Sequence, residues 1–343
     1  MQILSDAYTR AGGKNPVLLI HDERHGSGLI SAMARYGKGL PANVLPLSLY
    51  SIMQAGHDGY LGAVAAGFGQ VIVLGPPDQS EELPAVEGQM ALANTFLSGM
   101  GYGDEPRVTL LVEQDPDVVE EALHALPQMK NLKPSSFSAV GGKRQVARTI
   151  LARLNEEAPS PAEIIALPET APYGRVQIDL EGCTLCLACV GACPADALAD
   201  NPEFPQLRFT ESACVQCGLC AATCPEKVIT LNPQYNFSPE ALSQEVLNES
   251  EPFECISCGK PFGTKAAIDR VTSKLEGKHW MFQDSDQSRL IKMCDDCRII
   301  AMSEREDNPF ASGTRPRIRT TEDYLAAEEQ ARKTGKNVED FLD

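Results

Sequence analysis

Two cysteine runs in the middle of the chain have the spacing of iron–sulfur cluster ligands. Residues 183–194 read CTLCLACVGACP and residues 214–225 read CVQCGLCAATCP, so both follow the pattern C-x2-C-x2-C-x3-C-P. Cysteine thiolates hold iron–sulfur clusters, and this pattern is one that binds [4Fe–4S] cubes. Cys214 follows Cys183, and Cys224 follows Cys193, by the same 31 residues. The constant offset indicates a duplicated cluster-binding segment.

The pattern also predicts which cysteines share a cluster. Three thiolates spaced by two residues can wrap one corner of a cube, and in proteins with two such cubes the fourth cysteine ligates the other cluster. We therefore expect a first quartet of Cys183, Cys186, Cys189 and Cys224 and a second quartet of Cys214, Cys217, Cys220 and Cys193. Free or disulfide-bonded thiols with coincidental spacing are the alternative, and two complete motifs argue against it.

A second set of cysteines follows downstream in two C-x2-C pairs. Cys255 and Cys258 stand in CISCGKPF, and Cys294 and Cys297 stand in CDDC. Four thiolates suit a tetrahedral zinc ion, so we expect structural zinc in a small zinc-ribbon-like knuckle. The alternatives are a rubredoxin-like iron, a third cluster or free thiols. Residues 259–293 separate the pairs, which is a longer spacing than in the common zinc-ribbon pattern.

These motifs carry two resemblances. Residues 176–232 resemble the bacterial two-cluster ferredoxins in all eight ligand positions and both following prolines, which implies two [4Fe–4S] clusters in an α+β module. The span from PETAPYG through CVQCGLC and CPE to CISCGKPF and MCDDCR resembles a proteobacterial 4Fe–4S protein family often found beside formate dehydrogenase genes. That resemblance implies a cytoplasmic electron-transfer accessory of molybdenum- or tungsten-dependent formate oxidation. It also implies a shortened relative, or a carboxy-terminal piece, of a longer protein with further clusters.

The distribution of cysteines points to the same chemistry. All twelve lie between Cys183 and Cys297, and residues 1–182 contain none. In a reducing compartment, closely spaced thiols hold metal more often than they form disulfides. The first residues, MQILSDAYTRAGG, lack the basic start, apolar stretch and cleavage site of a secretory signal. We therefore expect a cytoplasmic protein whose cysteines bind metal.

The composition excludes several classes of partner. The chain has 343 residues, of which 43% are hydrophobic and 22% charged, so it can form two or three folded domains. No apolar run approaches the roughly 18 residues of a membrane span. The formal net charge of −17 disfavours nucleic acid or anionic lipid as a main partner. We expect protein redox partners instead, with no nucleic acid and no membrane span.

The first 158 residues alternate short apolar runs with longer amphipathic stretches, which is typical of a parallel sheet flanked by helices. The expected strands are 17–20, 44–47, 71–74 and 108–112, and the expected helices are 27–36, 59–67, 83–97 and 117–126. This order predicts a doubly wound α/β domain of the flavodoxin-like or Rossmann-like kind. Pro46 weakens the second expected strand.

This front domain also resembles the delta-subunit domain of methyl-viologen-reducing hydrogenase, which binds a [2Fe–2S] cluster. The chain departs from that pattern because no cysteine precedes Cys183. The resemblance therefore implies no cofactor in this domain. It implies instead that the domain serves as a scaffold or as a partner-binding surface.

The sequence shows no substrate-transforming centre. HDERH (residues 21–25) follows the first expected strand, where ligands bind in such folds, but it also fits a solvated strand-to-helix loop, which we favour. No G-x-G-x-x-G follows that strand, and no phosphate-binding G-x-x-x-x-G-K-[ST] occurs. GGKR (residues 141–144) lacks strand context and is expected to be a loop. Asp58 is expected to cap a helix.

Composition and motifs together divide the chain into five parts. We expect the α/β domain at 1–158, a Pro-rich linker at 159–175, the two-cluster ferredoxin domain at 176–233, the zinc-knuckle domain at 234–301, and a tail with a C-terminal helix at 302–343. That helix is expected within TTEDYLAAEEQARKTG, with Gly335 as its stop.

We interpret the chain as an iron–sulfur electron carrier or oxidoreductase subunit that relays single electrons between protein redox partners, with formate dehydrogenase subunits as candidates. One alternative is a redox enzyme subunit whose front domain binds a flavin or a substrate. Another is a maturation or sensing scaffold whose clusters maintain its shape.

Overall fold

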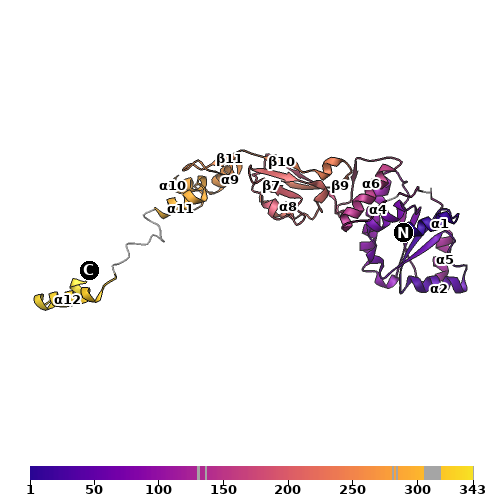
Figure 1. The fold of residues 1–343 in the computed structure, drawn as a ribbon, viewed down its shortest axis with the longest axis horizontal. Coiled ribbons are helices and arrows are strands. Elements are labelled where there is room, and N and C mark those ends of the chain that lie inside the picture. Colours follow the sequence, from indigo (N-terminus) through magenta and orange to yellow (C-terminus); the bar gives the residue numbers. More distant parts are fainter. Residues whose placement is uncertain (130–131, 136, 280–281, 283–284, 305–317, 343) are drawn as a thin grey trace. The chain divides into compact units, whose positions relative to one another are not determined.

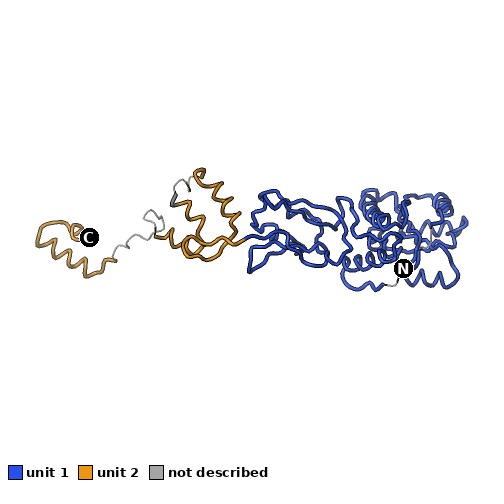
Figure 2. Tube along the Cα trace, turned by 90° about the horizontal axis from the view of Figure 1, so that it is seen from above, with its two compact units in different colours: residues 1–250 blue, residues 251–343 orange. Residues whose placement is uncertain are grey.

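The computed structural model describes the chain except for residues 130–131, 136, 280–281, 283–284, 305–317 and 343. The chain forms two compact units, residues 1–250 and 251–343 (Figure 2). Figure 1 labels several of the helices and strands of both units.

The front part of the first unit contains the parallel sheet that the sequence predicts. Its strands are β1 (Val17–Asp22), β2 (Val44–Leu49), β3 (Gln70–Gly75) and β4 (Val108–Val112), in the order β2-β1-β3-β4. The two central strands β1 and β3 are buried along their whole length, which is why they read as continuous apolar runs. Pro46 is accommodated because β2 lies at the edge of the sheet.

Helices cover both faces of this sheet, which confirms the doubly wound α/β class. The helices are α1 (Gln2–Arg10), α2 (Gly26–Tyr36), α3 (His57–Ala65), α4 (Leu83–Gly99), α5 (Pro116–His124) and α6 (Lys143–Glu156), with 3-10 turns η1 (Ile52–Gln54) and η2 (Pro77–Gln79). Leu19 of β1 packs in one core with residues of α2 and α5. Leu18 and Ile20 pack on the opposite face with residues of α3, α4 and α6.

Two small antiparallel sheets complete the first unit. Their elements are β5 (Ile164–Ala166), β6 (Gly174–Ile178), α7 (Ala188–Gly191), β7 (Leu198–Asp200), β8 (Gln206–Phe209), η3 (Glu211–Ala213), α8 (Leu219–Thr223), β9 (Ile229–Asn236), η4 (Pro239–Leu242) and β10 (Glu245–Glu249). One sheet has the order β5-β9-β6 and the other β10-β8-β7. The cysteine runs lie in the loops and short helices that connect these strands.

The structure divides the chain differently from the sequence-based boundaries. Residues 159–175, expected as a linker, contain β5, whose Ile165 is buried and which pairs with β9. Residues 234–250, expected in the knuckle domain, contain the end of β9 and all of β10, which pairs with β8. These strands are held by pairing with residues distant in sequence, and the first unit therefore extends to residue 250.

The second unit contains short strands and helices around the downstream cysteines. Its elements are β11 (Pro252–Glu254), β12 (Pro261–Thr264), α9 (Lys265–Leu275), α10 (Ser285–Arg289), η6 (Leu290–Lys292), α11 (Asp295–Ser303), α12 (Thr321–Thr334) and η7 (Val338–Phe341). The expected C-terminal helix is confirmed as α12. Thr320 and Asp323 form a capping box at its start, and Gly335 ends it with φ +70°. Among the residues that the structure describes, no helix is long and apolar enough to cross a bilayer.

Candidate cluster and metal sites

The duplication seen in the sequence is repeated in the backbone of the two cysteine loops. Three pairs of residues, each separated by 31 positions, have positive φ angles in both loops. The pairs are Leu185 and Gln216 (51° and 54°), Leu187 and Gly218 (60° and 78°), and Asp196 and Lys227 (50° and 55°). Left-handed backbone is uncommon for residues other than glycine and persists where the surrounding structure requires it. The two loops therefore have one shared local geometry.

The first quartet surrounds one cavity. Cys183, Cys186, Cys189 and Cys224 all line it, together with Ile178, Leu185, Leu207 and Ile229. Cys224 belongs to the second run, so the fold brings this cysteine to the three thiols of the first run. Thiolates around an apolar cavity fit a [4Fe–4S] cube, since the apolar groups limit water around the metal.

Electrostatic effects link Cys193 of the first run to the cysteines of the second run. Burial raises the pKa of Cys214 and that of Cys220, and the charge of Cys193 adds to the rise at both. Cys193 therefore lies within electrostatic range of the second run, although it belongs to the first. Burial likewise raises the pKa of Cys189 to about 11, with contributions from Cys186 and Cys183 of its own run. These effects are consistent with each run supplying its fourth cysteine, Cys193 or Cys224, to the cluster of the other run. That exchange of ligands stays a prediction.

Each quartet combines buried and exposed cysteines. Cys189, Cys214 and Cys220 are each 8% exposed, and they share one core with Phe209 and other apolar residues. Cys186 of the first quartet and Cys217 of the second are exposed. Both sites therefore reach from the core of the module to its surface.

Arg144 contacts the cluster module from α6. The expectation of a loop for GGKR is wrong for Lys143 and Arg144, which form the first turn of this helix. The Arg144 guanidinium donates hydrogen bonds to the backbone carbonyls of Ser212 and Cys214, beside the second quartet. No local sequence pattern indicates these contacts, because the two carbonyls lie 68 and 70 residues further along the chain.

The HDERH segment has a structural role. His21 and Asp22 end β1 and are buried, so the expectation of a solvated loop is wrong for these two residues. Asp22 Oδ1 accepts hydrogen bonds from the backbone N–H groups of His25 at 2.7 Å and Gly26 at 2.8 Å. His25 Nε2 lies 2.7 Å from the carbonyl oxygen of Glu113. These polar groups stabilise the start of α2 and its contact with the end of β4.

His57 lies in a second network that spacing alone did not reveal. Its Nδ1 is 2.7 Å from Gln89 Oε1, and its Nε2 is 2.8 Å from the Tyr173 hydroxyl. Burial of the imidazole ring is the main cause that lowers the pKa of His57. Asp58, expected as a helix cap, lies in the first turn of α3, and the N-cap is Gly56.

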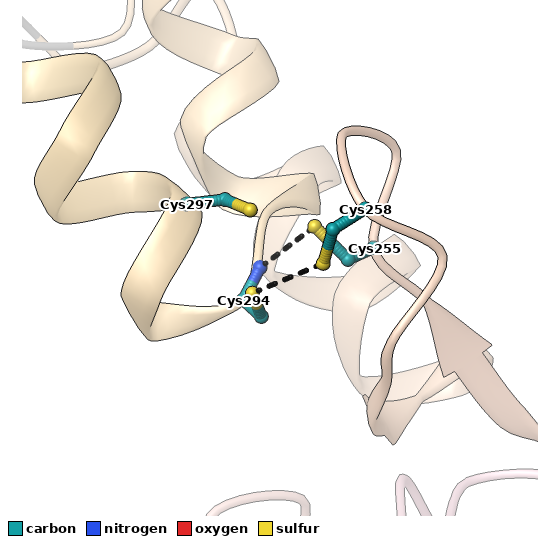
Figure 3. A group of neighbouring side chains, drawn as sticks. All are labelled: Cys255, Cys258, Cys294 and Cys297. Atoms are coloured by element: carbon teal, nitrogen blue, oxygen red, sulfur yellow. Dashed lines mark hydrogen bonds between the residues drawn. The ribbon is translucent and has the colours of Figure 1, made fainter.

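The downstream cysteines form one compact group. The ligand atoms of Cys255, Cys258, Cys294 and Cys297 all lie within 4.8 Å of one another (Figure 3). Sulfurs about 2.3 Å from one tetrahedral ion would be about 3.8 Å apart. The sulfurs of Cys258 and Cys294 are 3.7 Å apart, which matches that geometry. The structure therefore brings the four cysteines into one group that could hold a metal ion, and metal binding there stays a prediction.

Local structure favours ionised sulfur at Cys255, whereas side-chain hydrogen bonds with Cys258 and Cys294 raise the pKa of Cys297. Gly259, with φ +72°, allows the tight turn after Cys258, and Cys294 is the N-cap of α11. Desolvation opposes ionisation of the buried Cys255. Amide hydrogen bonds from Cys294, Cys258 and Ser257 outweigh that effect and lower the pKa of Cys255 to about 6. The lowered pKa favours the thiolate form of Cys255, which is the form that binds a cation.

Comparison with known proteins identifies the cysteine-rich part of the first unit. Residues 175–225 match the family model of the 4Fe-4S dicluster domain. The matched segment includes all eight cysteines of the two quartets. No curated protein matches the chain. The chain thus carries a ferredoxin-like 4Fe–4S module that binds iron–sulfur clusters.

Proposed function

We propose that this chain is an electron-transfer protein that relays single electrons between protein redox partners through two [4Fe–4S] clusters. The first quartet holds one cluster and the second quartet holds the other. The observation that carries the proposal is the duplicated cysteine loop, in which each quartet has one exposed cysteine in a module with a shared core. An iron–sulfur cluster near the surface can exchange electrons with a docked partner, and a neighbouring cluster provides the second hop.

Charge supports a basic partner. The chain has a formal net charge of −17, and bound thiolate clusters add negative charge at the module. Complementary charge accelerates the encounter of two proteins. Formate dehydrogenase subunits are our first candidate partners because of the family resemblance of the cysteine motifs. We place the exchange in the cytoplasm.

Electron exchange with a basic acceptor should slow as salt rises. The fully loaded chain, reduced without oxygen, would be mixed with cytochrome c as a basic one-electron acceptor. We expect the second-order rate to fall about tenfold between low salt and about 0.5 M KCl, because ions screen the acidic surface. Transfer to duroquinone, an uncharged acceptor, is the control and should change little. Equal salt dependence for both acceptors would contradict an electrostatically guided encounter.

We propose zinc as the ion of the downstream four-cysteine group. Four thiolates close the coordination shell, which is typical of structural zinc. Cys258→Ser should remove about one equivalent of zinc per chain and expose residues 251–304 to proteolysis, since such metal sites contribute folding free energy directly. Elemental analysis and limited proteolysis measure both effects, and Ser273→Ala, an exposed substitution on α9 of the same unit, is the control. Iron in place of zinc would support the rubredoxin-like alternative.

A cavity favours a second candidate function, in which the front part binds a flavin or a small substrate. It has a volume of about 520 Å³ and is lined by His57, Gln89, Lys143 and Tyr173. Val215, directly after Cys214 of the second quartet, lines the same cavity. A ligand there would lie beside the cluster loop. A flavin spectrum in protein purified without oxygen would favour this function over simple relay.

A further inference from the structure

Arg144 fixes a positive charge against the second quartet. Its Nη2 donates a hydrogen bond to the carbonyl oxygen of Cys214 at 2.6 Å, and its Nε donates to that of Ser212 at 3.0 Å. Its Nη1 donates to the carbonyl oxygen of Pro172 at 2.7 Å. The guanidinium carbon lies 4.7 Å from the centre of the Tyr173 ring. Three carbonyls and one aromatic face therefore hold the cation in a single position.

That cation is permanent and only partly screened. Burial lowers the pKa of Arg144, but an arginine side chain keeps its proton under all conditions in which proteins fold. Solvent and salt screen partly buried charges less than exposed ones. The charge of Arg144 therefore acts on the second quartet at any working pH.

Gln216 adds a second favourable contact on the same cysteine. Its side-chain amide Nε2 donates a hydrogen bond to the Cys214 sulfur at 3.3 Å. In the duplicated loop, the residue 31 positions earlier is Leu185, which has no side-chain donor. The two loops therefore share a backbone geometry but differ in hydrogen bonding to their sulfurs.

The surroundings of the first quartet have the opposite character. Among the described residues, its cavity is lined by the carboxylate residue Glu226 and by no lysine or arginine. Asp196 and Lys227 lie at equivalent positions of the two loops and carry opposite charges. Asp196 follows Cys193 of the second quartet and Lys227 follows Cys224 of the first, so these two charges would reduce the electrostatic difference between the quartets. Both are exposed, so solvent screens their effects. The partly buried contacts of Arg144 and Gln216 thus outweigh them.

We propose that Arg144 and Gln216 make the cluster of the second quartet easier to reduce than the cluster of the first quartet. This inference rests on the proposed function, since it requires both clusters. Reduction adds one negative charge to a cluster. A fixed cation and a hydrogen bond to a ligand sulfur stabilise the reduced form and so raise the potential. An electron that enters the module therefore reduces mainly the cluster of the second quartet, which lies beside α6 of the parallel-sheet part.

A reductive titration of the complete chain tests this inference. Protein purified without oxygen would be titrated with dithionite, a chemical electron donor, and followed by electron paramagnetic resonance. We expect wild type to show two separate midpoint potentials. In R144Q the upper potential should fall and the lower should stay. At the wild-type upper midpoint, the ratio of reduced to oxidised cluster should drop at least about tenfold, which corresponds to about 59 mV for a one-electron couple.

Two further variants make the outcome decisive. Q216L should lower the same potential, because leucine reproduces the residue of the first loop. R153Q is the matched control, since it removes an exposed arginine of the same helix, paired with Glu156 at 2.6 Å, and should shift neither potential. The inference is overturned if R144Q and Q216L shift both potentials equally or shift neither. Should R144Q lose iron, Q216L decides by the same criterion. A wild-type chain without clusters would instead refute the proposed function.

Discussion

A chain that combines Cys186→Ala with Cys193→Ala should contain no intact [4Fe–4S] cluster, whereas one that combines Cys186→Ala with Cys224→Ala should keep one. Cys186 and Cys224 belong to the first quartet, and Cys193 belongs to the second. The first pair of substitutions therefore damages both quartets, and the second pair damages only one. A quartet reduced to three thiolates cannot hold its fourth iron through cysteine.

The number of intact clusters per chain is the measurement. Iron and acid-labile sulfide would be determined on protein purified without oxygen, and Mössbauer spectra would separate four-iron from damaged clusters. Cys186→Ala and Cys193→Ala as single substitutions are the controls, and each should leave one intact cluster. The reverse pattern, with one cluster in the first double variant and none in the second, would show that each run keeps its own four cysteines.

Phe209→Ala should lower the free energy of unfolding of the cluster module by about 3–5 kcal/mol, the usual cost of removing a large buried aromatic side chain. Phe209 is fully buried at the end of β8, where it shares a core with Val176, Leu198 and the buried cysteines. The cavity left by alanine would also weaken the apolar shield of the ligands. We therefore expect the clusters to be lost at lower urea concentration and more quickly in air.

Phe204→Ala is the matched control for this substitution. Phe204 lies just before β8 and is 38% exposed, so its truncation should change stability by no more than about 0.5 kcal/mol. The urea midpoint for loss of cluster absorbance would be measured without oxygen for both variants. Equal midpoints would contradict the role of the Phe209 core in holding the two cysteine loops.

Short sequence patterns were sufficient to predict the elements that their own residues specify. The apolar runs at residues 17–20 and 71–74 predicted β1 and β3, because strands covered on both faces need continuous apolar sequence. The capping residues Thr320 and Asp323 marked the start of α12. The four downstream cysteines were predicted to meet because each C-x2-C pair supplies half of a tetrahedral site.

Elements and contacts that depend on residues distant in the sequence could not be predicted from short patterns. Ile165 lies between prolines in a stretch that reads as an extended connection, and only its pairing with β9 makes β5 a strand. Tyr173 gave no signal of its own, yet its hydroxyl contacts His57 and its ring lies beneath Arg144. These contacts depend on how the cluster module packs against the parallel-sheet part, which short sequence patterns do not encode.

Metal content of the complete chain, purified without oxygen, tests the central claim most directly. Iron, acid-labile sulfide and zinc would be determined per chain, with low-temperature electron paramagnetic resonance of the reduced protein. Two four-iron cubes and one four-thiolate site predict about eight irons, about eight sulfides and one zinc, with magnetic coupling between the reduced clusters. Colourless protein without labile sulfide would contradict the account.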